Sequence, residues 1–348
     1  MMLRVAFRTD ASPATGQGHL SRCLALAARL HARGIHCHFV GTETLRYWVA
    51  GIEAAGHQTS LIPEGLEARE DAAATLRALG TLRPDWLVID HYGLDARWHE
   101  AVRRAAPRLL AIDDLANRPL AVDAVLDPSP CAEAAAYRAL STEGCELLLG
   151  PTWCLLREEF ATARIGNVRT LSEARGGLRI HLALGGTDPA GATLPIAKAL
   201  LDWFASARVI AVLGQEGPSA QVLREFADAS GGRLEALVAT REVASTMARC
   251  DCAVGAPGGT LWERFCLGLP TACVTTAPSQ RPVIERLASE GWLLDLGEAC
   301  DFGEGQRGAL ARWLSNAAAL RSQRSRLTGA VDGLGAERLA GWMAERVR

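Results

Sequence analysis

An α/β fold with two domains is predicted by the order of apolar and amphipathic segments along this 348-residue chain. Short apolar runs alternate with stretches of helical period over almost the whole length, which is typical of βαβ units and parallel sheets. The alternation is interrupted by a less regular, polar stretch from Ala163 to Gly177 and then restarts. A chain of this length is also long for one hydrophobic core. The sequence therefore predicts two Rossmann-like domains, at 1–165 and 166–348.

The first series of segments predicts the N-terminal domain. Its expected strands are Leu3–Arg8, His36–Val40, Gln58–Ile62, Trp86–Asp90, Leu109–Asp113, Val122–Leu126 and Glu146–Leu149. Its expected helices include Gly18–Arg33, Leu66–Leu79 and Ala96–Ala106. Gly34 follows the first of these helices and is a suitable C-cap, because glycine adopts the left-handed conformation that ends many helices.

The second series predicts the C-terminal domain. Its expected strands are Leu178–Leu184, Arg208–Leu213, Leu234–Val238, Cys252–Val254 and Thr271–Thr275. The segment from Gly305 to Arg348 has only helical character, and its final helix is expected to be able to pack back on the N-terminal domain. Open parallel sheets bind ligands at the carboxyl ends of their strands, so we expect the loops of the two domains to face a common cleft. This architecture is called GT-B.

Composition excludes several classes of function. The chain is 49% apolar and 22% charged with a net charge of −2, so it gives no electrostatic reason to expect a nucleic-acid partner. The first residues do not resemble a signal peptide, and no apolar run reaches the ~20 residues that span a bilayer, so we expect a cytoplasmic protein without a membrane partner. The 10 cysteines contain no C-x-x-C pair, and no Cys or His completes a metal site around Cys250 and Cys252. We expect reduced thiols, no metal, no cofactor and a monomer.

The first strand-to-helix turn carries the sequence Arg8-Thr9-Asp10-Ala11-Ser12, followed by Thr15-Gly16-Gln17-Gly18-His19-Leu20-Ser21-Arg22. Gly16 and Gly18 allow a ligand to approach the backbone, and the helix start attracts anions. His19 stands at that start, where the helix dipole favours a neutral ring that can accept a proton. Asp10 is a candidate carboxylate beside an imidazolium. The alternative is a phosphate-binding loop in which the histidine is incidental.

A dinucleotide-binding role is disfavoured by the same turn. The fingerprint G-x-G-x-x-G has Ser21 in place of its third glycine. The second strand ends in His-Phe-Val-Gly-Thr, which provides no acidic residue for a ribose.

Polar residues also follow two later strands. Asp90, His91 and Tyr92 end the strand Trp86–Asp90 on the face where parallel sheets bind ligands. The alternative, that Asp90 caps the next helix and His91 packs in the core, remains open. Asp113 and Asp114 end the next strand, and for these two we expect helix capping and loop hydrogen bonds.

Two turns of the C-terminal domain could meet a diphosphate. Gly185, Gly186 and Thr187 precede a helix expected to start near Pro189, and they offer backbone N–H groups and a hydroxyl; the alternative is a plain left-handed turn.

Gly258, Gly259 and Thr260 open another helix, and Glu263 lies one turn inside it. Glu263 could accept hydrogen bonds from a ribose, or it could form a capping box with Thr260 as N-cap.

Together these segments resemble the UDP-2,4-diacetamido-2,4,6-trideoxy-β-L-altropyranose hydrolases of pseudaminic acid biosynthesis, which are relatives of the MurG-type glycosyltransferases. The resemblance covers roughly residues 3 to 300. The matching stretches are Arg8–Ser12, Gly16-x-Gly18-His19-x-x-Arg22, Ile89–Gly93, Asp113-Asp114, Leu156–Phe160 and Gly185–Asp188.

The resemblance implies a metal-independent GT-B enzyme that releases UDP and the free sugar. By analogy with single-displacement glycosidases, we expect inversion at C1. The resemblance also implies that His19 is the base, that Tyr92 lies beside the sugar, and that Glu263 holds the uridine ribose. We count Asp10, from its position near His19, with His19 and Tyr92 among the catalytic candidates. The substrate-binding residues would be Gly16, Gly18, Arg22, Arg157, Gly185, Gly186, Thr187, Gly258, Gly259, Thr260 and Glu263. The turn Ala256–Thr260 is richer in Gly and Pro than expected of the family. A MurG-like UDP-sugar glycosyltransferase, a UDP-sugar 2-epimerase and a non-catalytic binding module remain as alternatives.

Overall fold

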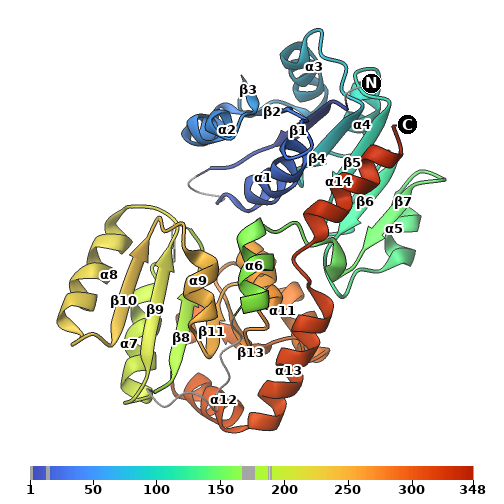
Figure 1. Cartoon of the computed structure of the whole chain (residues 1–348). Helices are drawn as coiled ribbons and strands as arrows, with labels where there is room; N and C mark the ends of the chain where they lie inside the picture. Colours follow the sequence, from blue (N-terminus) through green and yellow to red (C-terminus); the bar gives the residue numbers. More distant parts are fainter. Residues whose placement is uncertain (1–2, 13–15, 167–176, 187, 189, 348) are drawn as a thin grey trace. The chain divides into compact units, whose positions relative to one another are not determined.

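The computed structural model describes residues 3–12, 16–166, 177–186, 188 and 190–347 (Figure 1). The chain forms two compact units, which are Met1–Arg157 together with Gly333–Arg348, and Glu158–Asp332. Each unit is an α/β structure built around one parallel sheet. The predicted fold class, two Rossmann-like domains with parallel sheets, is confirmed.

The division between the units falls in front of helix α6 (Glu158–Gly166), whereas the sequence placed it at residue 165. Helix α6 packs against α9 (Val243–Ala248) and α10 (Gly259–Cys266), which both belong to the second unit. The polar stretch from Ala163 to Gly177, which suggested the later boundary, lies largely outside the described residues.

The first unit has a seven-stranded sheet in the order β3-β2-β1-β4-β5-β6-β7, in which every neighbouring pair is parallel. The strands are β1 (Val5–Thr9), β2 (Cys37–Thr42), β3 (Gln58–Ile62), β4 (Trp86–Asp90), β5 (Arg108–Ile112), β6 (Ala124–Asp127) and β7 (Glu146–Leu149). The chain runs from β1 outward to β3 and then crosses to β4 on the other side of β1. The strand order therefore reverses between β1 and β4.

Helices cover both faces of this sheet, because successive residues of a buried strand point to opposite sides. The helices are α1 (Gly18–His31), η1 (Glu43–Trp48), α2 (Val49–Ala54), α3 (Ala68–Leu79), α4 (Ala96–Val102), α5 (Ala134–Leu140), η2 (Pro151–Trp153) and α14 (Gly335–Glu345). Val5 and Phe7 of β1 belong to one core cluster, and Ala6 between them belongs to the other.

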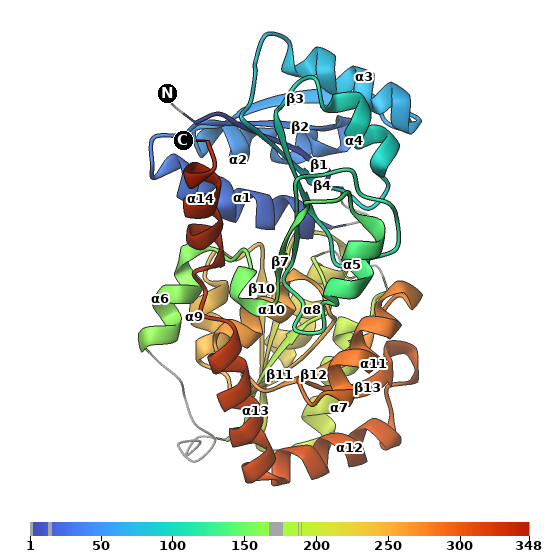
Figure 2. The ribbon, with the colours of Figure 1, turned by 90° about the vertical axis from the view of Figure 1, so that its right-hand side faces the viewer.

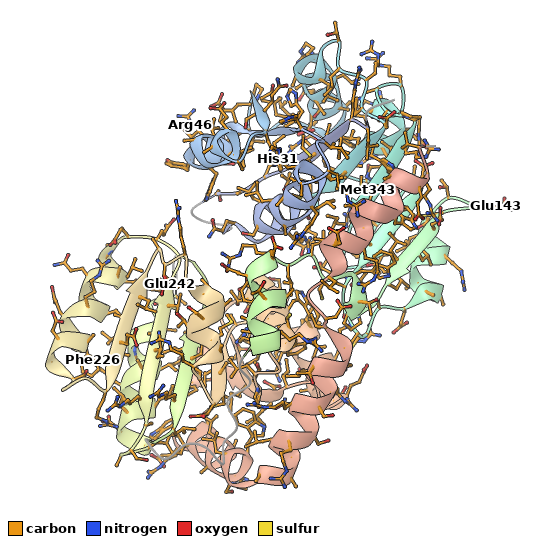
Figure 3. The ribbon with its side chains drawn as sticks, viewed as in Figure 1. His31, Arg46, Glu143, Phe226, Glu242 and Met343 are labelled. Atoms are coloured by element: carbon orange, nitrogen blue, oxygen red, sulfur yellow. The ribbon has the colours of Figure 1, made fainter. Side chains whose placement is uncertain are left out.

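The last helix of the chain is part of the first core. Helix α14 lies beside α1 (Figures 1 and 2). Met343 of α14, labelled in Figure 3, is fully buried in the cluster that contains Phe7. The Trp86 indole N–H donates to the Met343 carbonyl oxygen at 3.2 Å. Residues from the two ends of the chain thus stabilise the same sheet.

The second unit has a six-stranded parallel sheet in the order β10-β9-β8-β11-β12-β13. The strands are β8 (Arg179–Ala183), β9 (Arg208–Leu213), β10 (Leu234–Val238), β11 (Cys252–Gly255), β12 (Thr271–Thr275) and β13 (Leu294–Glu298). Five of these strands coincide closely with the predicted ones. The sequence did not predict β13, which lies at the edge and has only one fully buried residue, Leu296.

The helices of this unit complete its core around residues such as Ile180, Leu200 and Val254. They are α6, α7 (Thr193–Trp203), α8 (Pro218–Ala229), α9, α10, η4 (Pro278–Gln280), α11 (Arg281–Ser289), η5 (Ala299–Asp301), α12 (Glu304–Ser315) and α13 (Ala317–Ala330). The expected helical character of the chain's last segment is confirmed by α12, α13 and α14. No helix within the described ranges is long and apolar enough to cross a membrane.

Two buried histidines make the fold sensitive to acid. Burial lowers the pKa of His99 to about 4 and that of His181 to about 3, with help from the positive charges of Arg118 and Arg264 respectively. Below the unfolded pKa of about 6.5, the unfolded chain takes up protons that the folded chain does not accept until its own pKa is reached. The free energy of unfolding therefore falls as the pH drops from about 6.5 to about 4.

We expect His99 alone to lower the free energy of unfolding by about 2 kcal/mol between pH 7.5 and pH 5. Urea denaturation at the two pH values measures this loss. His99→Gln keeps an acceptor for the Ala121 N–H but has no imidazole to titrate. Because the other titrating groups contribute equally in both proteins, the variant should lose less stability between the two pH values. An equal loss in the variant would contradict this assignment.

Candidate functional site

Polar side chains gather at the carboxyl ends of β1, β4 and β5 in the first unit. His19 is the second residue of α1, which follows β1; Asp90 is the last residue of β4, and Asp114 comes shortly after β5. The strand order reverses between β1 and β4. Ligands of open parallel sheets bind at this reversal point, so the cluster lies where a substrate site is expected.

His19 is oriented by Asp90. The imidazole Nδ1 contacts Asp90 Oδ1, and the Asp90 side chain is fully buried. Burial alone would raise the pKa of Asp90, but the charge of Arg22 and the hydrogen bonds from Arg22 and His19 outweigh it and hold that pKa well below its usual range. An ionised carboxylate can only accept hydrogen bonds, so Nδ1 carries the hydrogen. In the uncharged form of the ring the lone pair is therefore on Nε2, and the His19 side chain is 28% exposed.

Arg22 fixes Asp90 from the other side. Its Nε donates to Asp90 Oδ2 and its Nη2 to Asp90 Oδ1, both at 2.7 Å. Its Nη1 donates to Asp114 Oδ2 at 3.1 Å. The sequence assigned Arg22 to substrate binding, but here its guanidinium bridges two carboxylates. The bidentate contact leaves Asp90 one orientation, which in turn sets the plane of the His19 ring.

Tyr92 forms one side of the site. Its ring meets that of His19 edge to face, with centroids 4.6 Å apart, and 41% of the residue is exposed. Its hydroxyl donates to Asp114 Oδ1 at 2.7 Å. Partial burial and the negative charge of Asp114 raise the pKa of Tyr92, so the hydroxyl stays protonated. The predicted residues His19, Arg22 and Tyr92 are therefore brought together.

Asp10 is not the carboxylate that contacts His19, which corrects the expectation from the sequence. Its Oδ2 lies 2.9 Å from Arg8 Nη1 and 3.3 Å from His91 Nε2, and its Oδ1 accepts from the Thr42 N–H at 2.6 Å. Arg8 is itself buried and is held by Asp71 at 2.6 Å. Asp10 therefore joins the ends of neighbouring strands and positions His91.

The alternative interpretation of Asp90 as a helix cap is wrong, because Asp95 caps α4 by accepting from the Arg97 N–H. The expectation for Asp113 is confirmed: its Oδ2 accepts the N–H groups of Leu115 and Ala116 in the loop. The expectation for Asp114 is wrong, since its carboxylate belongs to the His19 cluster. Ligands of parallel sheets bind at the carboxyl ends of the strands, and we used this rule to select Asp90. The same rule applied to the strand before Asp114 would have predicted Asp114 as a site residue.

The glycines before α1 shape the turn beside His19. Gly16 has a φ of 84° and pairs with Ser12 through two backbone hydrogen bonds. Gly18 is the exposed first residue of the helix, and a Cβ added there would meet no atom within 4 Å. The α1 N-cap is Gln17, whose side chain makes no capping hydrogen bond and instead accepts from the Trp48 indole N–H. The start of α1 is thus open to a ligand.

In the second unit, the Gly185–Gly186 turn follows β8, with Gly185 at a φ of 124°. Helix α7 begins at Thr193, not near Pro189 as predicted. Asp188 occupies the helix start, because its two carboxylate oxygens accept the N–H groups of Ala192 and Thr193. The N–H groups of Ala192 and Thr193 are thus already satisfied within the chain, and an anion at this helix start would meet the Asp188 carboxylate.

Helix α10 has the open start that α7 lacks. Gly258 is its N-cap, Gly258 and Gly259 are exposed, and a Cβ added at either would meet no atom within 4 Å. Thr260 is the second residue inside the helix, so the predicted capping box with Thr260 as N-cap does not form. Glu263 is half-buried one turn further along.

Two predicted diphosphate residues have no role assigned by the geometry. Thr187 lies outside the described residues. Arg157 is the half-buried last residue of the first unit before the chain enters α6. Within the described part of the chain, no group of three His, Cys, Asp or Glu side chains could hold a metal ion.

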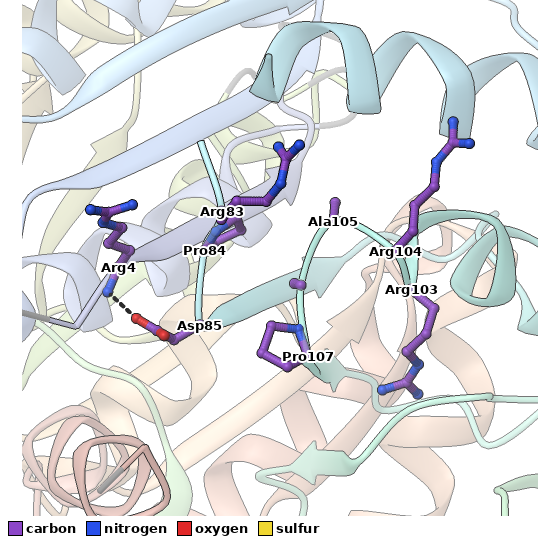
Figure 4. A pocket seen from close by; sticks show the side chains of 9 residues that line it. Arg4, Arg83, Pro84, Asp85, Arg103, Arg104, Ala105 and Pro107 are labelled. Carbon is purple, nitrogen blue, oxygen red and sulfur yellow. Dashed lines mark hydrogen bonds between the residues drawn. The ribbon is translucent and has the colours of Figure 1, made fainter. Parts of the chain in front are cut away.

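A cavity of about 440 Å³ lies away from this chemistry, in front of the amino ends of β4 and β5 (Figure 4). Its lining includes Arg4, Arg83, Arg103 and Arg104, and Asp85 accepts from the Arg4 backbone N–H at 2.8 Å. The cavity is thus at the opposite edge of the sheet from His19.

Two Rossmann-like units with parallel sheets in series define the GT-B fold, and solved structures support it. MurG from Acinetobacter baumannii has a TM-score of 0.69 and 14% identity, with 99% of both chains covered. A UDP-N-acetylglucosamine 2-epimerase has a TM-score of 0.60 and 14% identity, covering 99% of this chain and 95% of that one. The chain therefore has the GT-B fold.

No protein-family model matches the chain. An uncharacterised protein of Methanocaldococcus jannaschii is 22% identical over 287 residues, which are 80% of this chain and 57% of that protein. The UDP-2,4-diacetamido-2,4,6-trideoxy-β-L-altropyranose hydrolase of Campylobacter jejuni is 24% identical over 229 residues, which are 65% of this chain and 74% of that enzyme. The chain thus spans little more than half the length of the first relative.

Proposed function

We propose that this chain hydrolyses a UDP-linked diacetamido-trideoxy sugar at C1, releasing UDP and the free sugar. The observation that carries the proposal is the His19–Asp90–Arg22 arrangement at the strand-order reversal of the first unit. A partly exposed histidine whose Nδ1 is bound by a buried carboxylate is a suitable general base. The similarity to the hydrolase of Campylobacter jejuni supports the same reaction and substrate class.

The proposed reaction is a single displacement. His19 Nε2 accepts a proton from a water molecule, and the water oxygen attacks C1 of the sugar. The bond between C1 and the diphosphate oxygen breaks through an oxocarbenium-like state, and UDP leaves with the electron pair. Asp90 stabilises the imidazolium that forms. Because the diphosphate is already a good leaving group, the step needs no general acid.

The proposed nucleotide site is the open start of α10 in the second unit. Its N–H groups and helix dipole would stabilise the charge that grows on the diphosphate. Arg157 and the Gly185–Gly186 turn are proposed as further contacts to the nucleotide, following the resemblance to the hydrolases.

The hydrolase proposal is tested by incubating the protein with UDP-diacetamido-trideoxy sugars and no acceptor, followed by NMR. We expect UDP and free sugar with the anomeric configuration inverted at C1. UDP release only after an acceptor is added would indicate a MurG-like transferase. A UDP-linked product with changed stereochemistry at C2 would indicate an epimerase, which the similarity to such a fold keeps as the second candidate. Binding without turnover would leave only a binding module.

Glu263→Ala tests the proposed ribose contact. A carboxylate that accepts hydrogen bonds from both ribose hydroxyls contributes roughly 2 kcal/mol, so we expect UDP affinity to fall roughly 10–100-fold. Calorimetric titration with UDP measures the effect. The matched control is Glu285→Ala on α11, where the carboxylate pairs with Arg281 at the surface. Unchanged affinity in Glu263→Ala would remove the ribose role.

A further inference from the structure

A buried arginine lies where the second sheet reverses its strand order. The chain leaves β8 for β9 and β10 and then crosses to β11, so β8 and β11 flank the reversal point. Arg264 of α10 is fully buried. A Cβ added at Gly255, the last residue of β11, would lie 2.1 Å from Arg264 Nη1 and 2.6 Å from the Ala183 carbonyl oxygen at the end of β8. The guanidinium therefore occupies the carboxyl ends of the two strands that flank the reversal point.

The contacts of Arg264 hold the turn between β11 and α10. Its Nη2 donates to the Ala256 carbonyl oxygen at 2.6 Å, and its Nε to the Thr260 carbonyl oxygen at 3.1 Å. Its Nη1 is buried and has no hydrogen-bond partner among the described residues. Two of the three guanidinium nitrogens thus fix the turn, while the third has its hydrogen-bonding capacity unused.

The positive charge of Arg264 is only partly compensated by its surroundings, because the carboxylate of Glu263, its neighbour in the chain, acts on it without outweighing the effect of burial. No carboxylate forms an ion pair with it within the part of the chain that the structure describes. Burial lowers the pKa of Arg264, and its charge helps to keep the buried His181 neutral. A buried cation whose charge is incompletely compensated is costly in free energy, so an anion from outside the chain that bound nearby would be stabilised.

The start of α10 provides the place for that anion. The helix has no acidic residue in its first turn, and its N-cap, Gly258, has no side chain that could form a capping hydrogen bond. The start of α7, by contrast, is already occupied by Asp188. The α10 start therefore combines a positive dipole end, an open surface and a buried cation beneath the same turn.

We propose that Arg264 is a positioning residue that supplies the counter-charge for a nucleotide diphosphate bound at the start of α10. It does so from beneath the turn: it holds the Ala256 carbonyl and adds its field to that of the helix, without touching the ligand. This inference rests on the proposed function, because it assumes that the site takes a UDP group. It goes beyond that proposal by assigning the diphosphate selectivity to one buried side chain.

The test compares UDP with uridine, which lacks the diphosphate. UDP affinity is measured by calorimetry and uridine affinity by ligand-observed NMR, both on the full chain. We expect Arg264→Gln to weaken UDP binding about 10–100-fold and to change uridine binding less than about threefold. Arg264→Lys retains the charge and should recover most of the UDP affinity. Arg104→Gln, an exposed arginine of the cavity in Figure 4, is the matched control and should bind both ligands normally.

Several outcomes would overturn the inference. Equal weakening of UDP and uridine binding in Arg264→Gln would show that Arg264 has a purely structural role. Unchanged UDP affinity would show that Arg264 has no role in binding at this site. If the unaltered chain binds neither ligand, the proposed function itself fails. Thermal unfolding checks the variants, and Arg264→Met, which keeps the bulk of the side chain, replaces the Gln variant if that protein does not fold.

Discussion

His19→Ala is expected to lower kcat by about 10²–10⁴ while UDP affinity stays within about threefold of the original value. The ring supplies the proposed base through Nε2, and its removal leaves water without a proton acceptor near C1. UDP binding is proposed to depend on the second unit, which this substitution does not touch. Steady-state kinetics and calorimetric titration with UDP measure the two effects separately.

The matched control is His36→Ala. His36 is an exposed histidine directly before the amino end of β2, at the opposite edge of the sheet from the candidate site, and its Nδ1 contacts the Gly56 carbonyl oxygen. This variant should keep kcat near the original value. If His19→Ala were as active as the unsubstituted chain, His19 could not be the base, and the proposed mechanism would fail.

Asp90→Asn is expected to affect both catalysis and stability. The amide cannot stabilise an imidazolium as a carboxylate does, and it can present an N–H to Nδ1, which would favour the wrong tautomer of His19. Comparable substitutions in catalytic triads suggest a loss of kcat on the order of 10²–10⁴. The change also removes the carboxylate that Arg22 binds in a buried setting, so the free energy of unfolding should fall by about 3 kcal/mol.

Urea denaturation and kinetics below the unfolding transition separate these two effects. The control is Asp85→Asn, a carboxylate in front of the opposite end of β4 that accepts one backbone N–H. It should cost about 1 kcal/mol or less and leave kcat unchanged. If Asp90→Asn had a normal kcat, the reaction would not depend on the Asp90 carboxylate orienting the His19 imidazole.

The edge strand β13 shows where sequence periodicity stops being informative. Its sequence Leu-Asp-Leu-Gly-Glu contains two acidic residues and a glycine, and Gly297 adopts a φ of 75°. Such a segment has little intrinsic preference for a strand. It pairs because the edge of β12 at that place is otherwise unpaired in the described part of the sheet. The local sequence cannot show which strand edges are unpaired, since that depends on the tertiary structure. The buried central strands, by contrast, were predictable from their apolar runs alone.

The site was predictable only in part for a similar reason. The positions of His19 and Tyr92 followed from the rule that ligands bind at the carboxyl ends of parallel strands. Their partners did not follow, because Asp90 lies 71 residues from His19 in the sequence and Asp114 lies 92 residues from Arg22. Asp10 was the nearest carboxylate in sequence, but it is oriented toward Arg8 and His91 instead.

The amino-acid sequence by itself determined the α/β class, the two parallel sheets, most of their strands and the turn that carries His19. These features depend on local period and on turn residues, which act over a few positions of the chain. Only the tertiary structure decided which carboxylate meets the imidazole, that Asp188 closes the start of α7, and that Arg264 is buried with no ion pair to the residues the structure describes. Those features depend on strand order and crossover connections, which bring distant segments to one edge of a sheet.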